Sequence, residues 1–213
     1  MPADNNNAQL LVEGKNDQHV IWALCDQHQI AKTFTVEIPR ETEGGVDILL
    51  DSIPVRLKIP RLRALGIVLD ADQDIRARWE SLKSRLVKVG YRPLPDVPAP
   101  LGTIIDIPGK PKIGVWIMPD NKLPGMLEDF VAYLIPEGDI LAMKARTVLR
   151  DIEHAHLNKY PPDHHAKAFI HTWLAWQRVP GQPMGQAITV RSLSYDAPLA
   201  QMFAGWLQRL FQE

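Results

Sequence analysis

The stretch LLVEGKND, residues 10–17, is the best guide to the fold, because an apolar run stops there at an acid, a glycine and further charges. Such a run is typical of a strand buried on both faces of a parallel sheet. The residues that follow suit a helix capped by Asn16, with apolar side chains at helical spacing: Val20, Ile21, Leu24 and Cys25. The stretch therefore predicts a strand, a tight turn and a helix.

A second stretch, GIVLDADQD at residues 66–74, repeats this pattern, since its apolar run also ends in acid and a helical pattern follows at 75–91. Strands are further predicted at 33–39, 102–108 and 112–119, and a helix at 44–62 that is interrupted near Pro54. Alternation of this kind favours an α/β fold with a mainly parallel sheet flanked by helices. The predicted domains are an α/β core at 8–135 and a C-terminal helical extension at 136–213, packed on the core.

Composition narrows the class of protein. The chain of 213 residues is 46% hydrophobic and 23% charged, which is ordinary for a globular protein, and its net charge of −1 favours no particular partner. No apolar stretch approaches the roughly 20 residues of a membrane span. The first residues lack a signal-peptide pattern, and the single cysteine, Cys25, excludes an internal disulfide, so we expect a cytoplasmic protein.

Acidic residues gather where two of the predicted strands end. Glu13 and Asp70 follow parallel strands, whose carboxyl ends open onto one crevice. Asp72 follows Asp70 at the alternate-residue spacing of an extended chain, and Asp17 lies one helical turn from Glu13. Crowded carboxylates repel one another unless a cation neutralises them, so the pattern predicts a Mg²⁺ site, with Mn²⁺ as a substitute, suited to phosphate chemistry. Taken singly, acids at such positions are more often solvated residues at a strand end.

The two motifs LLVEGKND and GIVLDADQD together resemble those of a Toprim domain, a metal-binding domain of primases, topoisomerases and overcoming-lysogenisation-defect nucleases. The resemblance covers roughly residues 8–120, and PGMLEDF at 124–130 resembles small stand-alone bacterial Toprim-like proteins of poorly known function. It implies a Toprim-like sheet in which Glu13 is a general acid or base or a metal ligand. It also implies that Asp17 assists catalysis and that Asp70 and Asp72 hold Mg²⁺.

Further residues extend this candidate site. Asp74 is either another metal ligand or a residue that complements the dipole of the following helix. A second metal would fall to Asp120, Glu128 and Asp129, for which the alternative is a capping turn and a solvated helix face. Lys15 is a candidate phosphate contact.

Two functions follow from this interpretation. The first is a Mg²⁺-dependent enzyme acting on phosphodiesters of DNA or RNA, most simply a nuclease, because no tyrosine domain for strand cleavage and no primase zinc ribbon accompany the motifs. An excess of Lys and Arg over Asp and Glu between residues 56 and 88, nine against four, suits a nucleic acid partner. The alternative is a non-catalytic metal- or nucleic-acid-binding regulatory subunit that partners an ATPase.

Overall fold

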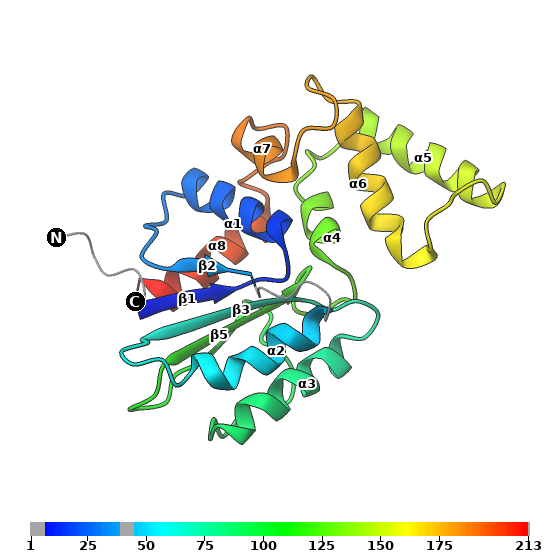
Figure 1. Cartoon of the computed structure of the whole chain (residues 1–213). Helices are drawn as coiled ribbons and strands as arrows, with labels where there is room; N and C mark the ends of the chain where they lie inside the picture. The colour runs from blue at the N-terminus through cyan, green and yellow to red at the C-terminus, as the bar shows by residue number, and fades with distance from the viewer. Residues whose placement is uncertain (1–6, 39–44, 213) are drawn as a thin grey trace.

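The core of the protein is a five-stranded sheet with the strand order β2-β1-β3-β5-β4 (Figure 1). The structure is a computed structural model that describes residues 7–38 and 45–212. Four strands are parallel, and β4 pairs antiparallel with β5 at one edge. This confirms the predicted α/β fold. The strands are β1 (Ala8–Leu11), β2 (Thr35–Glu37), β3 (Ala64–Asp70), β4 (Thr103–Ile105) and β5 (Lys112–Met118).

Helices cover both faces of the sheet, as Figure 1 shows. Side chains on one face form a core with α2 and α3, and those on the other face form a core with α1 and the C-terminal helices. The central strands are therefore buried on both sides, which explains their unbroken apolar runs. The helices are α1 (Lys15–Gln27), α2 (Gly45–Arg56), α3 (Ile75–Lys88), α4 (Leu127–Ala132), α5 (Ile140–His154), the 3₁₀ turn η2 (Pro162–His164), α6 (His165–Ala175), α7 (Met184–Thr189) and α8 (Pro198–Phe211).

Three local predictions differ from the structure. Helix α1 begins at Lys15 with Gly14 as its N-cap, so Asn16 is not the cap. Helix α2 continues through Pro54 and ends two residues later, and α7, which is too short for a helical repeat to show, was not predicted. The sequence-based ranges also include residues 39, 44 and 213, which lie outside the described residues.

The last helix, α8, lies directly on the centre of the sheet. Gly66 of β3 and Gly114 of β5 are paired neighbours, and a Cβ atom on either would meet the side chain of Leu210. The two glycines thus make room for α8 to approach the strands. Trp206 of α8 packs with Trp116 of β5 at a ring separation of 5.8 Å. The C-terminal helix is therefore part of the sheet's own hydrophobic core.

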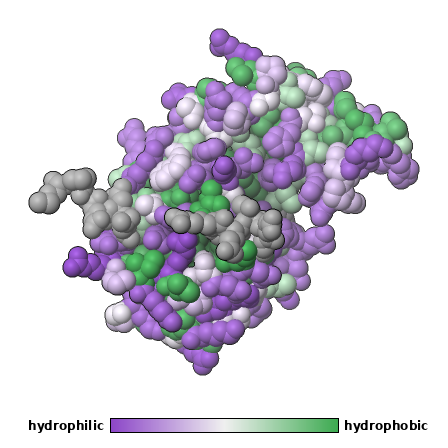
Figure 2. Space-filling view, in the orientation of Figure 1, coloured by the Kyte–Doolittle hydropathy of each residue, from purple (hydrophilic) through white to green (hydrophobic). Residues whose placement is uncertain are grey.

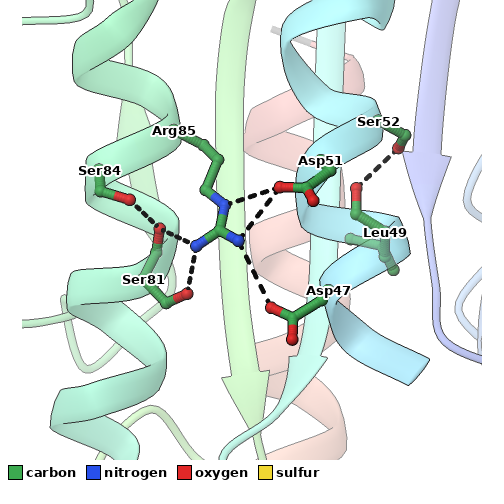
Figure 3. Close-up of polar contacts among 7 residues, drawn as sticks. All are labelled: Asp47, Leu49, Asp51, Ser52, Ser81, Ser84 and Arg85. Carbon is green, nitrogen blue, oxygen red and sulfur yellow. Dashed lines mark hydrogen bonds and ion pairs between the residues drawn. The ribbon is translucent and has the colours of Figure 1, made fainter. Parts of the chain in front are cut away.

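Helices α2 and α3 are joined by one arginine, shown in Figure 3. Arg85 of α3 pairs with Asp51 at 3.1 Å and Asp47 at 3.4 Å, both on α2, and also donates to Ser81 on its own helix. Because both aspartates are about 70% exposed, solvent screens these pairs, and together they are worth at most about 1 kcal/mol. They orient α3 against α2 more than they stabilise the fold.

Helices α5 and α6, together with the segment between them that contains η2, form an arm beside the sheet (Figure 1). Figure 2 shows a mostly hydrophilic face with hydrophobic patches over this arm. Within residues 7–38 and 45–212, no helix is long and apolar enough to cross a membrane. The arm carries exposed large hydrophobic side chains, which are Ile140, Leu141, Met143, Val148 and Leu157.

Candidate acidic site at the carboxyl edge of the sheet

Glu13 and Asp70 meet at the carboxyl edge of the sheet, as the sequence predicts. Glu13 lies two residues beyond β1, Asp70 ends β3, and the backbone N–H of Asp70 donates to Oε1 of Glu13 at 2.8 Å. The carboxylate of Asp70 is held in turn by the backbone N–H of Leu127, the first residue of α4, at 2.9 Å. Two strand ends and a helix start therefore fix these two carboxylates.

Two further acids line the same pocket. Asp17 of α1 is 7% exposed and accepts a 3.0 Å hydrogen bond from the N–H of Gly14, so it folds back over the site. Glu128 of α4 is 5% exposed, and its nearest cation is Lys167 of α6, 3.6 Å away. The pocket is lined by Glu13, Gly14, Lys15, Asn16, Asp17, Asp70, Met126, Leu127, Glu128, His164 and Lys167.

The crowding of these acids changes their protonation. Burial raises the pKa of Asp70 well above its usual value, and the charges of Glu13, Asp17 and Glu128 raise it further. Burial and the charge of Glu13 raise the pKa of Asp17 to about 7. Burial also raises the pKa of Glu13, although the Asp70 N–H and Arg78 partly offset the effect. Burial and mutual repulsion therefore favour the protonated forms of these acids.

Asp72 takes a different direction from Asp70. Its φ of +52° breaks the extended geometry expected for residues 70–72, and its backbone pairs with Gly125 on the loop before α4. The side chain pairs with Arg78 of α3, whose Nε also donates to the carbonyl oxygen of Asp70 at 2.8 Å. Asp72 consequently lines a neighbouring groove, which shares Met126 and His164 with the acidic pocket. The groove is lined by Ala71, Asp72, Gln73, Asp74, Ala77, Arg78, Ser81, Gly125, Met126, Asp129, Asp163 and His164.

Three other predicted residues serve as local caps. Asp74 is the N-cap of α3 and accepts from the N–H groups of Arg76 and Ala77 at 2.9 and 3.0 Å. Asp129 accepts from the N–H of Met126 at 2.9 Å, lines the neighbouring groove, and has a pKa raised by burial. The carboxylate of Asp120 accepts from two backbone N–H groups of its own turn, and Asp120 lines neither the acidic pocket nor the groove.

The acidic residues suit Mg²⁺ by their chemistry, because carboxylate oxygens are the ligands that a hard cation prefers. Within residues 7–38 and 45–212, however, no three His, Cys, Asp or Glu side chains are already gathered around one metal position. The cause is visible in the contacts, since the carboxylates of Asp70, Asp72 and Asp74 each have a partner of their own. Glu13 and Asp70 lie together in the pocket, with Asp17 and Glu128 beside them.

The fold adds three residues that sequence reasoning missed. Arg78 lies one helical turn after the cap Asp74, so its place beside the acidic run had a local signal in the sequence. Lys167 and His164 come from the arm, more than 90 residues beyond β3 in the chain, and line the acidic pocket. No local pattern brings them there; only the packing of α4 against α6 does.

The fold and site define an α/β protein with a mostly parallel sheet and a pocket of buried and half-buried carboxylates at the carboxyl edge of that sheet. A family model described as "Protein of unknown function (DUF3226)" matches residues 7–212, and the chain belongs to this family. Neither the comparison with curated proteins nor that with solved structures finds a match.

Proposed function

We propose that this protein is a Mg²⁺-dependent, Toprim-like enzyme that acts on phosphodiesters of DNA or RNA, most simply a nuclease. One observation carries the proposal: Glu13, Asp17, Asp70 and Glu128 line a single pocket in which burial and mutual repulsion raise the pKa of Asp17 and Asp70. Crowded carboxylates at the carboxyl edge of a parallel sheet suit a divalent cation, and such a cation suits phosphate oxygens.

In this proposal Glu13 and Asp70 hold the cation. Bound there, Mg²⁺ would neutralise phosphate charge and lower the pKa of a water molecule. Asp17, with a pKa of about 7, holds or releases a proton at neutral pH and so suits general acid or base catalysis. Lys15 and Lys167 line the same pocket and supply positive charge for phosphate. In this proposal the nucleic acid strand extends from the pocket into the neighbouring groove, which is lined in part by Arg78.

The test compares isosteric variants in two assays. Purified protein should bind Mn²⁺ in calorimetry and cut or nick at least one substrate from a panel of single- and double-stranded DNA and RNA. Glu13→Gln and Asp70→Asn should each reduce the affinity for Mn²⁺ and the rate of cleavage by a hundredfold or more. The control is Asp26→Asn, which changes an exposed acid paired with Lys32 and should leave both quantities unchanged. The nuclease proposal fails if no substrate of the panel is cleaved in the presence of Mg²⁺ or of Mn²⁺.

A second candidate is a non-catalytic metal- or nucleic-acid-binding regulatory subunit that partners an ATPase. It is favoured by the contact between Asp72 and Arg78, because the guanidinium occupies the carboxylate that would complete a three-acid site with Glu13 and Asp70. This candidate predicts metal or nucleic acid binding without turnover. The two assays above therefore separate the candidates.

A further inference from the structure

Basic residues gather at the amino edge of the sheet, which is the end that lies away from the arm in Figure 1. Three segments meet there: residues 57–63 before β3, residues 88–92 at the end of α3, and residues 106–112 from the end of β4 to the start of β5. Strands β3 and β5 have seven residues each, so this edge is about 20 Å from the acidic pocket. The basic residues of the three segments, which we call the amino-edge patch, are Lys58, Arg61, Arg63, Lys88, Arg92, Lys110 and Lys112.

Hydrogen bonds join the three segments into one surface. The backbone N–H of Lys112 donates to the carbonyl oxygen of Arg63 at 2.8 Å, which connects the start of β5 to the segment before β3. The ammonium group of Lys110 donates to the carbonyl oxygen of Gly90 at 2.6 Å, which connects the same hairpin to the end of α3. The basic side chains of the patch therefore lie at one place in the fold and are not scattered over the surface.

The positive charge of the patch is not balanced locally. Asp106 is the one acid in the three segments, and within residues 7–38 and 45–212 none of the seven basic residues forms an ion pair. The carboxyl ends of α2 and α3 contribute about half a negative charge each, so helix dipoles offset only about one positive charge. Because the whole chain has a net charge of −1, the excess is local and favours a polyanion at this edge. The exposed members of the patch are Lys58, Arg61, Arg63, Lys88 and Arg92.

The aromatic content of the patch narrows the kind of polyanion. Proteins that bind single strands stack the bases on aromatic side chains, whereas the phosphates of a duplex need only cations. Tyr91 is the one aromatic residue in the three segments, and it is 2% exposed. The patch thus offers charge without a stacking surface, which favours a duplex.

We propose that the amino-edge patch binds the phosphate backbone of a nucleic acid duplex without regard to its sequence. This contact is separate from the acidic pocket, and it requires neither a bound cation nor cleavage. It therefore adds a second surface to the proposed function but does not rest on it.

Fluorescence anisotropy with labelled duplexes of about 20 base pairs, with EDTA present, tests the proposal. The logarithm of the affinity should fall linearly with the logarithm of the salt concentration, with a slope of about −0.9 for each phosphate contact. Arg61→Asn suits the φ of +65°, and Arg63→Gln keeps the main-chain bond to Lys112. The double variant should reduce the magnitude of the slope by about 2 and weaken binding by about tenfold or more.

The matched control removes two exposed cations from the arm. Lys144→Gln with Arg150→Gln changes the net charge equally and should leave the slope and the affinity as in the parent chain. Duplex DNA and duplex RNA serve as separate probes, and the tighter of the two identifies the ligand. The proposal is overturned if neither duplex binds at about 50 mM salt, or if the folded double variant keeps the parent slope.

Two competitors complete the test. A single strand of the same length, or vesicles that contain phosphatidylserine, should bind less tightly than the duplex, and tighter binding of either would overturn the proposal. Cleavage is measured separately with Mg²⁺. An unchanged slope in the double variant contradicts only this inference, whereas an absence of cleavage contradicts only the proposed nuclease.

Discussion

The backbone N–H of Asp70 donates a 2.8 Å hydrogen bond to the carboxylate of Glu13, so a side chain joins the ends of β1 and β3 beyond their last ladder contact. The residue that we propose as a metal ligand is thus also a structural connection. Substitutions at Glu13 must therefore be chosen so that loss of chemistry is not confused with loss of fold.

Glu13→Gln and Glu13→Ala separate these two roles. The amide oxygen of glutamine still accepts from Asp70, whereas alanine leaves that partly buried N–H without its partner. We expect Glu13→Ala to lower the free energy of unfolding by about 1–3 kcal/mol and Glu13→Gln to lower it by clearly less. Urea denaturation at pH 7 measures both. Equal losses in the two variants would show that the hydrogen bond does not contribute to stability.

Asp17 makes stability depend on pH. Its pKa is about 7 in the folded protein and 3.8 as a free side chain, so folding favours the protonated form. This contribution is complete below about pH 4, is lost as the pH rises through 7, and is worth at most about 4 kcal/mol. The free energy of unfolding should therefore fall between pH 5 and pH 8. Asp17→Asn should flatten this slope, and parallel slopes for the two proteins would refute the linkage.

Binding of Mg²⁺ should show the opposite dependence on pH. Protons and the cation compete for Glu13 and Asp70, whose pKa values are both raised by burial. We expect the affinity to increase from pH 6 to pH 8, with protons released on binding. Calorimetry in two buffers of different ionisation enthalpy measures this release. A pH-independent affinity would place the cation outside the buried pocket.

Arg78 should matter more than other cations of α3. It pairs with Asp72, donates to the Asp70 carbonyl and is only 12% exposed, so Arg78→Gln should cost about 1–3 kcal/mol of stability. Lys83→Gln is the matched control on the same helix. Its partner Glu80 is 62% exposed, and the loss should be under about 0.5 kcal/mol. Urea denaturation checks both, and similar losses would contradict the assigned role of Arg78.

The contact of α8 with the sheet can be tested by adding one methyl group. A Cβ atom on Gly114 would overlap Leu210, so Gly114→Ala should destabilise the protein by about 1–3 kcal/mol. Adding Leu210→Ala should cost less in that background than in the parent chain, because the two sites are coupled. The control is Gly205→Ala within α8, where the nearest atom is 3.5 Å away and helix propensity favours alanine. Additive losses would mean that Leu210 does not fill this space.

The sequence was sufficient to predict the strands and the meeting of Glu13 with Asp70. Both follow from general rules, since long apolar runs form buried strands and the ends of parallel strands share one edge. The direction of Asp72 was not predictable from its spacing, because its positive φ turns the side chain out of the alternating pattern.

Residues that come together only through long-range packing illustrate a second limit. Glu128 was assigned from the sequence to a separate second metal, yet it lines the same pocket as Glu13 because α4 begins beside the end of β3. Lys167 enters only through the packing of α6 on α4. Such long-range contacts are not visible in the local periodicity of the sequence.

The two glycines beneath Leu210 also bear on how the chain folds as it is synthesised. The space between β3 and β5 that they leave open is filled by residues near position 210. Until those residues leave the ribosome, the part of β3 and β5 that α8 covers stays exposed, and exposed hydrophobic surface of this kind favours aggregation. The hydrophobic core on this side of β3 and β5 is therefore complete only after α8 has been synthesised, long after the two strands have emerged.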